Sequence, residues 1–138
     1  MREILFRGKR DDGEWVEGYF VHCKSIYDDE TGRTAEIIPH NADRIYDGEY
    51  SPYDVHKVIL ETVGQFTGLT ENGKRIFEGD IVKAFFRNTH SKQIFRVVFD
   101  DGIFLFDNNC VKVPKYDIYA MEVIGNIHDN PELLEANK

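Results

Sequence analysis

Tight-turn signals separate short apolar runs along most of this chain, and this pattern constrains its fold more than any other feature. Asp-Gly or Asn-Gly pairs lie between such runs at 12–13, 72–73 and 101–102. Glycine readily takes the positive φ angles that two-residue hairpin turns require, so each pair predicts a β-hairpin. Apolar residues at the spacing of an amphipathic helix are nearly absent. The pattern therefore predicts a mostly β protein built from short antiparallel strands.

The apolar runs give the expected strands, which are 4–6, 14–21, 35–39, 58–63, 75–78, 80–86, 94–99, 103–106 and 118–127. Strict alternation in the last strand would place Ile118, Ala120 and Glu122 on one face. Tyr119 and Met121 would then lie on the other face. A short helix is expected only at the C-terminus.

The length of 138 residues allows one domain or two small subdomains. We expect an N-terminal β subdomain over 1–63, with an irregular excursion at about 40–57. A C-terminal small β-barrel subdomain over 64–138 would end in the helix, where Asn130 and Pro131 suit its cap and first position. The two halves form either separate units or one shared core.

Acidic residues outnumber basic ones by 25 to 17, which gives a net charge of −8. Such a balance argues against a protein that coats DNA, because that function needs a basic footprint. It leaves room for a local basic patch. Four basic residues bracket one predicted hairpin and are interleaved with three phenylalanines: Lys83, Arg87, Lys92 and Arg96, with Phe85, Phe86 and Phe95. The alternative is that these phenylalanines fill the core and the charges are merely solvated.

Residues 65–69 form the least ordinary polar and aromatic stretch. In a strand, Gln65 and Thr67 share one face and Phe66 lies on the other. One interpretation puts Phe66 in the core and Thr67 in a turn that ends at Gly68. The other makes this stretch the lip of a barrel that binds a partner.

The sequence holds no motif for a cofactor or a metal, and we expect neither. Cys23 and Cys110 form no metal-binding pair and are predicted to be buried, reduced thiols. The five histidines are scattered, and both a phosphate-binding glycine loop and a serine nucleophile elbow are missing from the sequence.

Catalysis would have to use Glu78, Asp80 or His40. Glu78 and Asp80 flank Gly79, which is expected to bend the backbone between two strands. A carboxylate pair can perform acid and base chemistry, but no nucleophile accompanies this one. We therefore expect Asp80 to accept hydrogen bonds from nearby backbone amides, and the chain to be non-enzymatic.

The N-terminus lacks the apolar run of a signal peptide, and no stretch approaches the roughly 20 apolar residues of a membrane span. These features predict a cytoplasmic protein without membrane association.

Three blocks of sequence occur in order along the chain: Phe6-Arg7-Gly8-Lys9 with Gly13, Trp15-Val16 and Gly18; Gln65 to Leu69 with Asn72-Gly73-Lys74 and Ile76 to Val82; and Glu122 to Leu134. Together they resemble the YopX-like family of phage and prophage proteins. The resemblance implies a β-rich fold whose C-terminal half is similar to a small Src-homology-like barrel, in a bacterial host cell. It implies no catalytic residue and no activity.

We therefore expect a phage or prophage accessory protein that works as a non-enzymatic interaction module and binds a host or phage protein through its barrel surface or strand edges. The first alternative is a nucleic-acid-binding small barrel, and the second is a hydrolase-type enzyme. The aromatic surplus also suggests a homo-oligomer. The expected binding residues are Gln65, Phe66, Thr67, Lys83, Arg87, Lys92 and Arg96.

Overall fold

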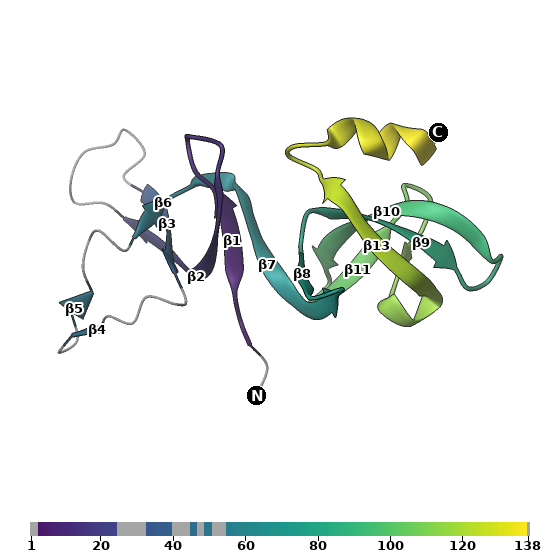
Figure 1. Ribbon diagram of the computed structural model, residues 1–138, viewed down its shortest axis with the longest axis horizontal. Helices are drawn as coiled ribbons and strands as arrows, with labels where there is room; N and C mark the ends of the chain where they lie inside the picture. Colours follow the sequence, from purple (N-terminus) through teal and green to yellow (C-terminus); the bar gives the residue numbers. More distant parts are fainter. Residues whose placement is uncertain (1–2, 25–32, 40–44, 47–48, 51–54, 138) are drawn as a thin grey trace. The chain divides into compact units, whose positions relative to one another are not determined.

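The computed structural model describes residues 3–24, 33–39, 45–46, 49–50 and 55–137 (Figure 1). The chain divides into two compact units, Met1–Phe66 and Thr67–Lys138. Antiparallel strands dominate both units, which confirms the mostly β fold. The predicted division into an N-terminal subdomain over 1–63 and a C-terminal subdomain over 64–138, as separate units or with one shared core, stays a prediction.

The N-terminal unit is built on one antiparallel sheet. Its strands are β1 (Phe6–Lys9), β2 (Trp15–Lys24), β3 (Arg33–Pro39), β6 (His56–Lys57) and the first part of β7 (Ile59–Glu71), in the order β6-β3-β2-β1-β7. Ala35, Ile37 and Val58 form its buried core, against which Phe6 and Phe20 pack. Within the expected excursion at 40–57, the structure describes residues 55–57 and a pair formed by β4 (Ile45–Tyr46) and β5 (Glu49–Tyr50). The remainder of that excursion lies outside the described residues.

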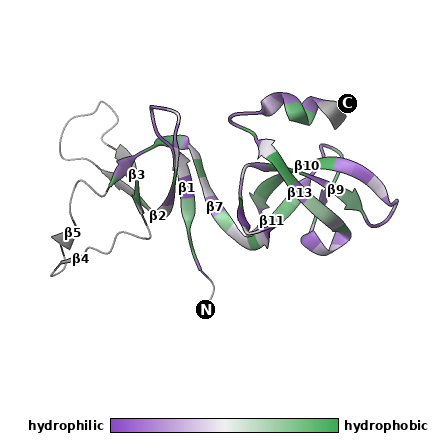
Figure 2. Cartoon of the chain, in the orientation of Figure 1, coloured by the Kyte–Doolittle hydropathy of each residue, from purple (hydrophilic) through white to green (hydrophobic). Residues whose placement is uncertain are grey.

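The C-terminal unit begins as β7 continues to Glu71 and pairs with β8 (Lys74–Phe77). A five-stranded antiparallel sheet follows in the order β12-β11-β10-β9-β13. These strands are β9 (Asp80–Phe86), β10 (Ser91–Asp100), β11 (Ile103–Asp107), β12 (Lys112–Val113) and β13 (Ile118–Asn126). Hydrophobic residues recur along β9, β10, β11 and β13 (Figure 2). Phe95, Phe106 and Ile118 are fully buried in the core between them.

The expected small barrel is not confirmed as a closed one. In the part of the chain that the structure describes, the outer strands β12 and β13 of this sheet are not paired with each other. The C-terminal helix is a short 3-10 helix, η3 (Pro131–Asn137), with proline at its first position as expected. The side chain of Asn130 accepts a hydrogen bond from the backbone N–H of Asn126 at 3.3 Å, and its expected role as the helix cap stays a prediction.

The predicted turn residues take the backbone conformations that hairpins need. Asn72 and Gly73 have φ of 49° and 78°, and Asp101 and Gly102 have φ of 51° and 79°. Two successive positive φ angles are those of a type I′ turn, whose twist matches that of the flanking strands. Gly13 has φ of 88° in the longer turn between β1 and β2. All three predicted hairpins are therefore confirmed.

The Glu78-Gly79-Asp80 block is a structural bend. Gly79 has φ of 92°, its N–H donates to the carbonyl of Val97 at 2.9 Å, and its carbonyl accepts from the N–H of Ile127 at 2.9 Å. The buried carboxylate of Asp80 accepts the backbone N–H of Phe77 at 2.8 Å. The bend thus ties β9 to both of its neighbours, as the structural interpretation of Asp80 predicts.

The expected alternation along β13 is wrong because the strand contains a bulge. The register with β9 shifts between Tyr119 and Glu122, and Ala120 has φ of 54°. The extra residue reverses the alternation that follows it. Met121 therefore packs in the core, and Glu122 lies opposite Lys83 on the other face.

Cys110 is exposed, which contradicts its expected burial. It lies in the loop after β11, where the side-chain oxygen of Asn108 accepts the backbone N–H groups of both Cys110 and Val111 at 2.9 Å. The buried residue of this loop is Asn108, so the thiol turns outward. The side chain of Cys23 lies outside the described residues.

The end of β10 is joined to β12 by an exposed ion pair. Lys112 Nζ lies 2.9 Å from Asp100 Oδ2, and this hydrogen bond and charge lower the pKa of Asp100 and raise that of Lys112. A carboxyl with a lowered pKa stabilises the fold at neutral pH, and this contribution disappears as the pH falls through its folded-state pKa.

Lys112→Gln should return the pKa of Asp100 toward its ordinary value, because the two largest causes of the lowering, a hydrogen bond and a charge, both come from Lys112. An NMR titration of the Asp100 carboxyl measures this change directly. Lys115→Gln, which removes another exposed charge of the same unit, is the matched control and should leave that pKa unchanged. An unshifted Asp100 in the Lys112 variant would mean that the ion pair does not form in solution.

Candidate functional site

The outer face of the five-stranded sheet carries a row of aromatic and cationic side chains. The core takes Ala84 from β9, so its neighbour Phe85 points to the opposite face. Phe85 is paired with Lys92 on β10 and with Tyr119 on β13. Three adjacent strands therefore place their side chains next to one another. Arg87, in the loop between β9 and β10, completes the row.

We call Lys92, Phe85, Tyr119 and Arg87 the ladder, in the order in which they contact one another. The rings of Phe85 and Tyr119 are stacked, with centroids 5.3 Å apart and planes 16° from parallel. Lys92 Nζ lies 5.6 Å from the centroid of Phe85, and Arg87 Cζ lies 5.2 Å from that of Tyr119. Each ring thus contacts the other ring and one cation.

The Arg87 end of the ladder is held by several hydrogen bonds. Arg87 Nε donates to the carbonyl of Tyr116 at 3.0 Å, and its backbone N–H donates to the carbonyl of Asp117 at 2.8 Å. His90 Nδ1 and the Tyr119 hydroxyl share a hydrogen bond of 3.0 Å. These bonds fix the loop against β13 and orient both the guanidinium and the phenol ring.

The same sheet face is covered at its other end. The helix η3 packs on β10, and a Cβ at Gly125 would lie only 3.0 Å from Leu133 of this helix. Ile81, which is paired with Gly125, is fully buried. Near the ladder, by contrast, Lys92 and Arg87 are exposed and the two rings are half-buried. The ladder therefore lies in an open part of this face.

A hollow of about 380 Å³ adjoins the ladder at its Arg87 end. Phe86, Arg87, Asn88 and Asp117 line it. It holds both a cation and a carboxyl group, so it is not a simple anion site.

The acidic excess of the chain belongs mainly to the unit that does not carry the ladder. Residues 1–66 hold fourteen acidic and eight basic residues, a formal charge of −6. Residues 67–138 hold eleven and nine, a formal charge of −2. The unit that carries the ladder thus has a formal charge close to zero. This small negative charge does not cancel the local positive charge of the exposed Arg87 and Lys92.

Comparisons with known proteins give a family match over nearly the whole chain. The model of the YopX protein family matches residues 5–135. The chain belongs to the YopX family. The resemblance predicted from the three sequence blocks is thereby confirmed.

Two relatives of this YopX-family chain have informative matches. It is 35% identical over 79 residues to the SPbeta prophage-derived protein YopX of Bacillus subtilis (strain 168), a match that covers 51% of this chain and 58% of that protein. The chain thus matches little more than half the length of that relative. The crystal structure of protein EF1440 from Enterococcus faecalis is 26% identical, with a TM-score of 0.56, and the match covers 97% of this chain and 99% of that one. The fold of the YopX-family chain is therefore shared with the Enterococcus protein over nearly its full length.

Of the predicted basic residues, Arg87 and Lys92 belong to the ladder and Lys83 lies near it. Arg96 has a different role. Arg96 donates from Nε and Nη2 to Asp107 Oδ2 at 3.0 and 2.9 Å. Asp107 is buried, so this guanidinium compensates a charge inside the fold. The three phenylalanines also divide: Phe95 fills the core, as the alternative interpretation predicts, whereas Phe85 lies outside.

The predicted residues Gln65, Phe66 and Thr67 lie in β7 and not on the ladder face. Phe66 is buried. The Thr67 hydroxyl donates to the carbonyl of Ile76 at 2.8 Å and accepts the N–H of Leu69 at 3.1 Å. Both side chains thus have structural roles, although the strand continues beyond Gly68 to Glu71. Gln65 is half-buried, and a binding role for this stretch stays a prediction.

Sequence reasoning missed Tyr119 and His90. Tyr119 lies 34 positions beyond Phe85, and only the pairing of β13 with β9 brings the two rings together. His90 reaches Tyr119 because it takes φ of 55° in the loop. The available signal was the alternation in β13, whose first residues correctly place Tyr119 opposite the buried Ile118.

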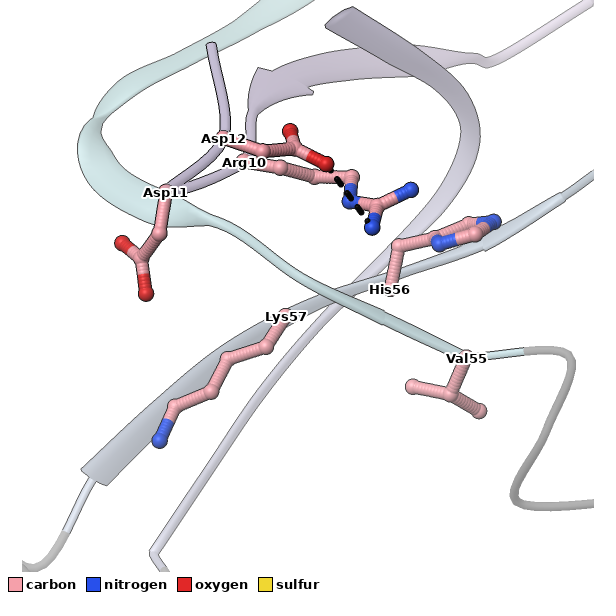
Figure 3. Close-up of a pocket in the computed structure, with 6 residues that line it drawn as sticks. All are labelled: Arg10, Asp11, Asp12, Val55, His56 and Lys57. Carbon is pink, nitrogen blue, oxygen red and sulfur yellow. Dashed lines mark ion pairs between the residues drawn. The ribbon is translucent and has the colours of Figure 1, made fainter. Parts of the chain in front are cut away.

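A second hollow, of about 290 Å³, lies at the turn between β1 and β2 (Figure 3). Its lining residues are Arg10, Asp11, Asp12, Val55, His56 and Lys57. Arg10 Nη2 forms an ion pair with Asp12 Oδ2 at 3.0 Å. Because the lining carries both signs of charge and its guanidinium is already paired, it defines no ligand class.

Within the described ranges, no group of three or more His, Cys, Asp and Glu side chains is arranged to hold a metal ion. His40, one of the candidate hydrolase residues, lies outside those ranges. In the same described part of the chain, no helix has the length and apolar character needed to cross a membrane.

Proposed function

We propose that this YopX-family protein is a phage or prophage accessory protein that acts as a non-enzymatic macromolecular interaction module, with the ladder as its contact surface. The observation that supports this most directly is the exposed cation–ring–ring–cation row on an open sheet face. Aromatic residues and arginine are enriched at interfaces and often dominate binding energy there. The ladder supplies both types on a rigid scaffold.

The hydrogen bonds around Arg87 strengthen the proposal. A contact surface that is already ordered loses little conformational entropy on binding. Arg87 and Tyr119 are held by backbone carbonyls and by His90, so their side chains are oriented before a partner arrives. A row of side chains that served only to stabilise the sheet would not need hydrogen bonds that fix the position of Arg87.

The cations favour a negatively charged partner. An acidic surface of a host or phage protein satisfies this condition, and so does a nucleic acid. The prophage origin of the Bacillus relative supports a function inside a bacterial cell, which agrees with the cytoplasmic location that we propose. Self-association into a homo-oligomer is a further proposal, which sedimentation velocity tests.

A hydrolase-type enzyme is the less favoured alternative. The carboxylate of Asp80 is buried and accepts a backbone hydrogen bond in the bend. A general acid or base must reach a substrate atom, either directly or through one water molecule. The position of Asp80 therefore supports a structural role.

The test is an affinity capture from host lysate with the wild-type chain and an Arg87→Gln/Lys92→Gln variant. We expect at least one partner to be captured by the wild type and lost with this variant. Lys57→Gln/Lys74→Gln removes the same charge from exposed positions off the ladder and should retain the partner. Capture that is unchanged by the Arg87/Lys92 variant would overturn the assignment of the ladder as the contact surface. Treatment with nuclease separates protein partners from those bridged by nucleic acid.

A further inference from the structure

The ladder has the chemistry of a surface that binds unpaired bases. We infer that it binds single-stranded nucleic acid, with bases stacked on Phe85 and Tyr119 and phosphates bound by Arg87 and Lys92. This inference rests on the proposed function and names its ligand. Proteins that bind single strands without sequence preference combine aromatic platforms for the bases with a cationic track for the backbone. The ladder places these two elements in direct contact.

The alternation of charge and ring favours a nucleic acid over an acidic protein surface. Carboxylates on a protein need cations but have no use for two stacked rings between them. A nucleotide presents an anion and a π surface together, so each ring and its cation match one nucleotide. Phe85 with Lys92, and Tyr119 with Arg87, make two such pairs.

The rings also favour single strands over duplexes. Bases in a duplex have their faces covered by neighbouring base pairs, whereas an unpaired base can stack on an aromatic side chain. A duplex would meet Arg87 and Lys92 through phosphates alone and would leave Phe85 and Tyr119 unused. We therefore expect binding to a single strand to depend on the rings, and any binding to a duplex to depend only on charge.

Lys92 now lies over the Phe85 ring, where a base would stack, and this arrangement allows an exchange. A cation–π contact at an exposed site is weaker than the stacking of a base on an aromatic ring. Lys92 is exposed, so a base can replace its ammonium group on Phe85. The displaced ammonium then lies beside the phosphate of the same nucleotide. The four ladder side chains thus contact one another in the free protein and contact the nucleic acid in the bound state.

Two carboxyl groups limit the extent of the cationic track. Glu122 lies directly opposite Lys83, and Asp117 lines the hollow beside Arg87. Both oppose a phosphate at those positions. We therefore expect two phosphate contacts, through Arg87 and Lys92, and a short footprint with modest affinity.

The test is fluorescence anisotropy with labelled oligonucleotides of about 10 nucleotides, within the range of footprints known for small barrels. The full chain is titrated to about 100 µM against single-stranded DNA, single-stranded RNA and a DNA duplex of the same sequence. Such concentrations cover the micromolar range of non-specific binding. We expect the single strands to bind more tightly than the duplex. For two phosphate contacts, log K should fall against log salt with a slope of about −1.4, since each contact contributes about −0.7.

Variants separate the two roles. Tyr119→Ala should weaken single-strand binding about 5- to 150-fold while leaving the salt slope unchanged, and Tyr119→Phe should retain binding because it keeps the ring. Lys92→Gln should make the slope less steep by about 0.7, whereas Lys74→Gln, an exposed charge off the ladder, should not. Circular dichroism confirms that each variant is folded. Equal binding by Tyr119→Ala and wild type would overturn base stacking.

The outcome distinguishes this inference from the proposed function. If no single strand binds while Arg87→Gln/Lys92→Gln still abolishes capture of a nuclease-resistant partner, the ligand is a protein: the inference is wrong and the proposed function stands. If neither oligonucleotide binding nor capture depends on the ladder, both are wrong. Binding that follows charge alone, with duplex equal to single strand, also overturns the inference.

Discussion

Asp80→Ala is expected to lower the free energy of unfolding by about 2–3 kcal/mol, because it removes a hydrogen bond to a charged acceptor and leaves a buried N–H without that partner. The carboxylate of Asp80 is only 2% exposed and accepts the N–H of Phe77 at 2.8 Å. It closes the bend at which Gly79 links β9 to β10. Urea denaturation followed by circular dichroism measures the loss.

Two further variants make this result specific. Asp80→Asn keeps an oxygen that can accept the same N–H, so it should cost less than alanine. Glu78→Ala changes the other carboxylate of the block and, as a partly exposed position, should change stability by about 0.5 kcal/mol or less. Full stability of Asp80→Ala would mean that the carboxylate is not needed for folding. The hydrolase alternative would then regain support, since a buried acid without a structural role is a candidate for chemistry.

The hairpins could be predicted from the sequence because their cause is local. Asn72-Gly73 and Asp101-Gly102 need only their own φ angles to form type I′ turns, and two adjacent residues determine both. The Glu78-Gly79-Asp80 bend is local as well, because Asp80 bonds a residue three positions away. Such features are encoded within a few residues, so pattern reasoning finds them.

The bulge in β13 could not be predicted in the same way. Alanine is not a residue that favours a positive φ, so Ala120 gives no sign of the bulge in the sequence. Alternation read from the sequence also assumes a strand without extra residues. The register with β9 is a tertiary property. The bulge lies between Tyr119 and Glu122. The predicted alternation therefore assigns Tyr119 to the correct face and is wrong only for residues that follow the bulge.

The candidate site was predicted in part for a related reason. Lys83, Arg87 and Lys92 could be grouped because one hairpin carries them. The sequence could not distinguish Arg87 from Arg96, since the difference lies in a partner eleven residues further on, the buried Asp107. Nor could it pair Phe85 with Tyr119. Charge clustering thus indicated the region, and strand pairing determined which of its residues form the ladder.

The charge distribution also bears on how such a module could work in a cell. A strongly acidic N-terminal unit repels nucleic acid and the acidic surfaces of other proteins in general. The near-neutral C-terminal unit carries two of its exposed cations, Arg87 and Lys92, at the ladder. If the ladder binds as proposed, this distribution disfavours contacts elsewhere on the chain and directs binding to the face where rings and cations occur together.

Phe95→Ala is expected to lower the free energy of unfolding of the C-terminal unit by about 3–5 kcal/mol, the usual cost of truncating a buried phenylalanine. Phe95 is completely buried in the core with Phe106 and Ile118. Phe99→Ala, on the same strand but 49% exposed, is the matched control and should cost far less. Chemical denaturation followed by circular dichroism measures both variants.

The same variant tests whether the two units unfold separately. Trp15 is the one tryptophan of the chain and lies in β2, so its fluorescence reports the N-terminal unit. That unit has its own core, centred on Ile37, and β7 is a strand of both units. Because each of these two core clusters is built from residues of one unit alone, Phe95→Ala should move the transition of the C-terminal unit and leave the Trp15 transition in place. Ile37→Ala should do the reverse. Equal shifts in both signals for either variant would instead mean that the chain unfolds as a single cooperative unit.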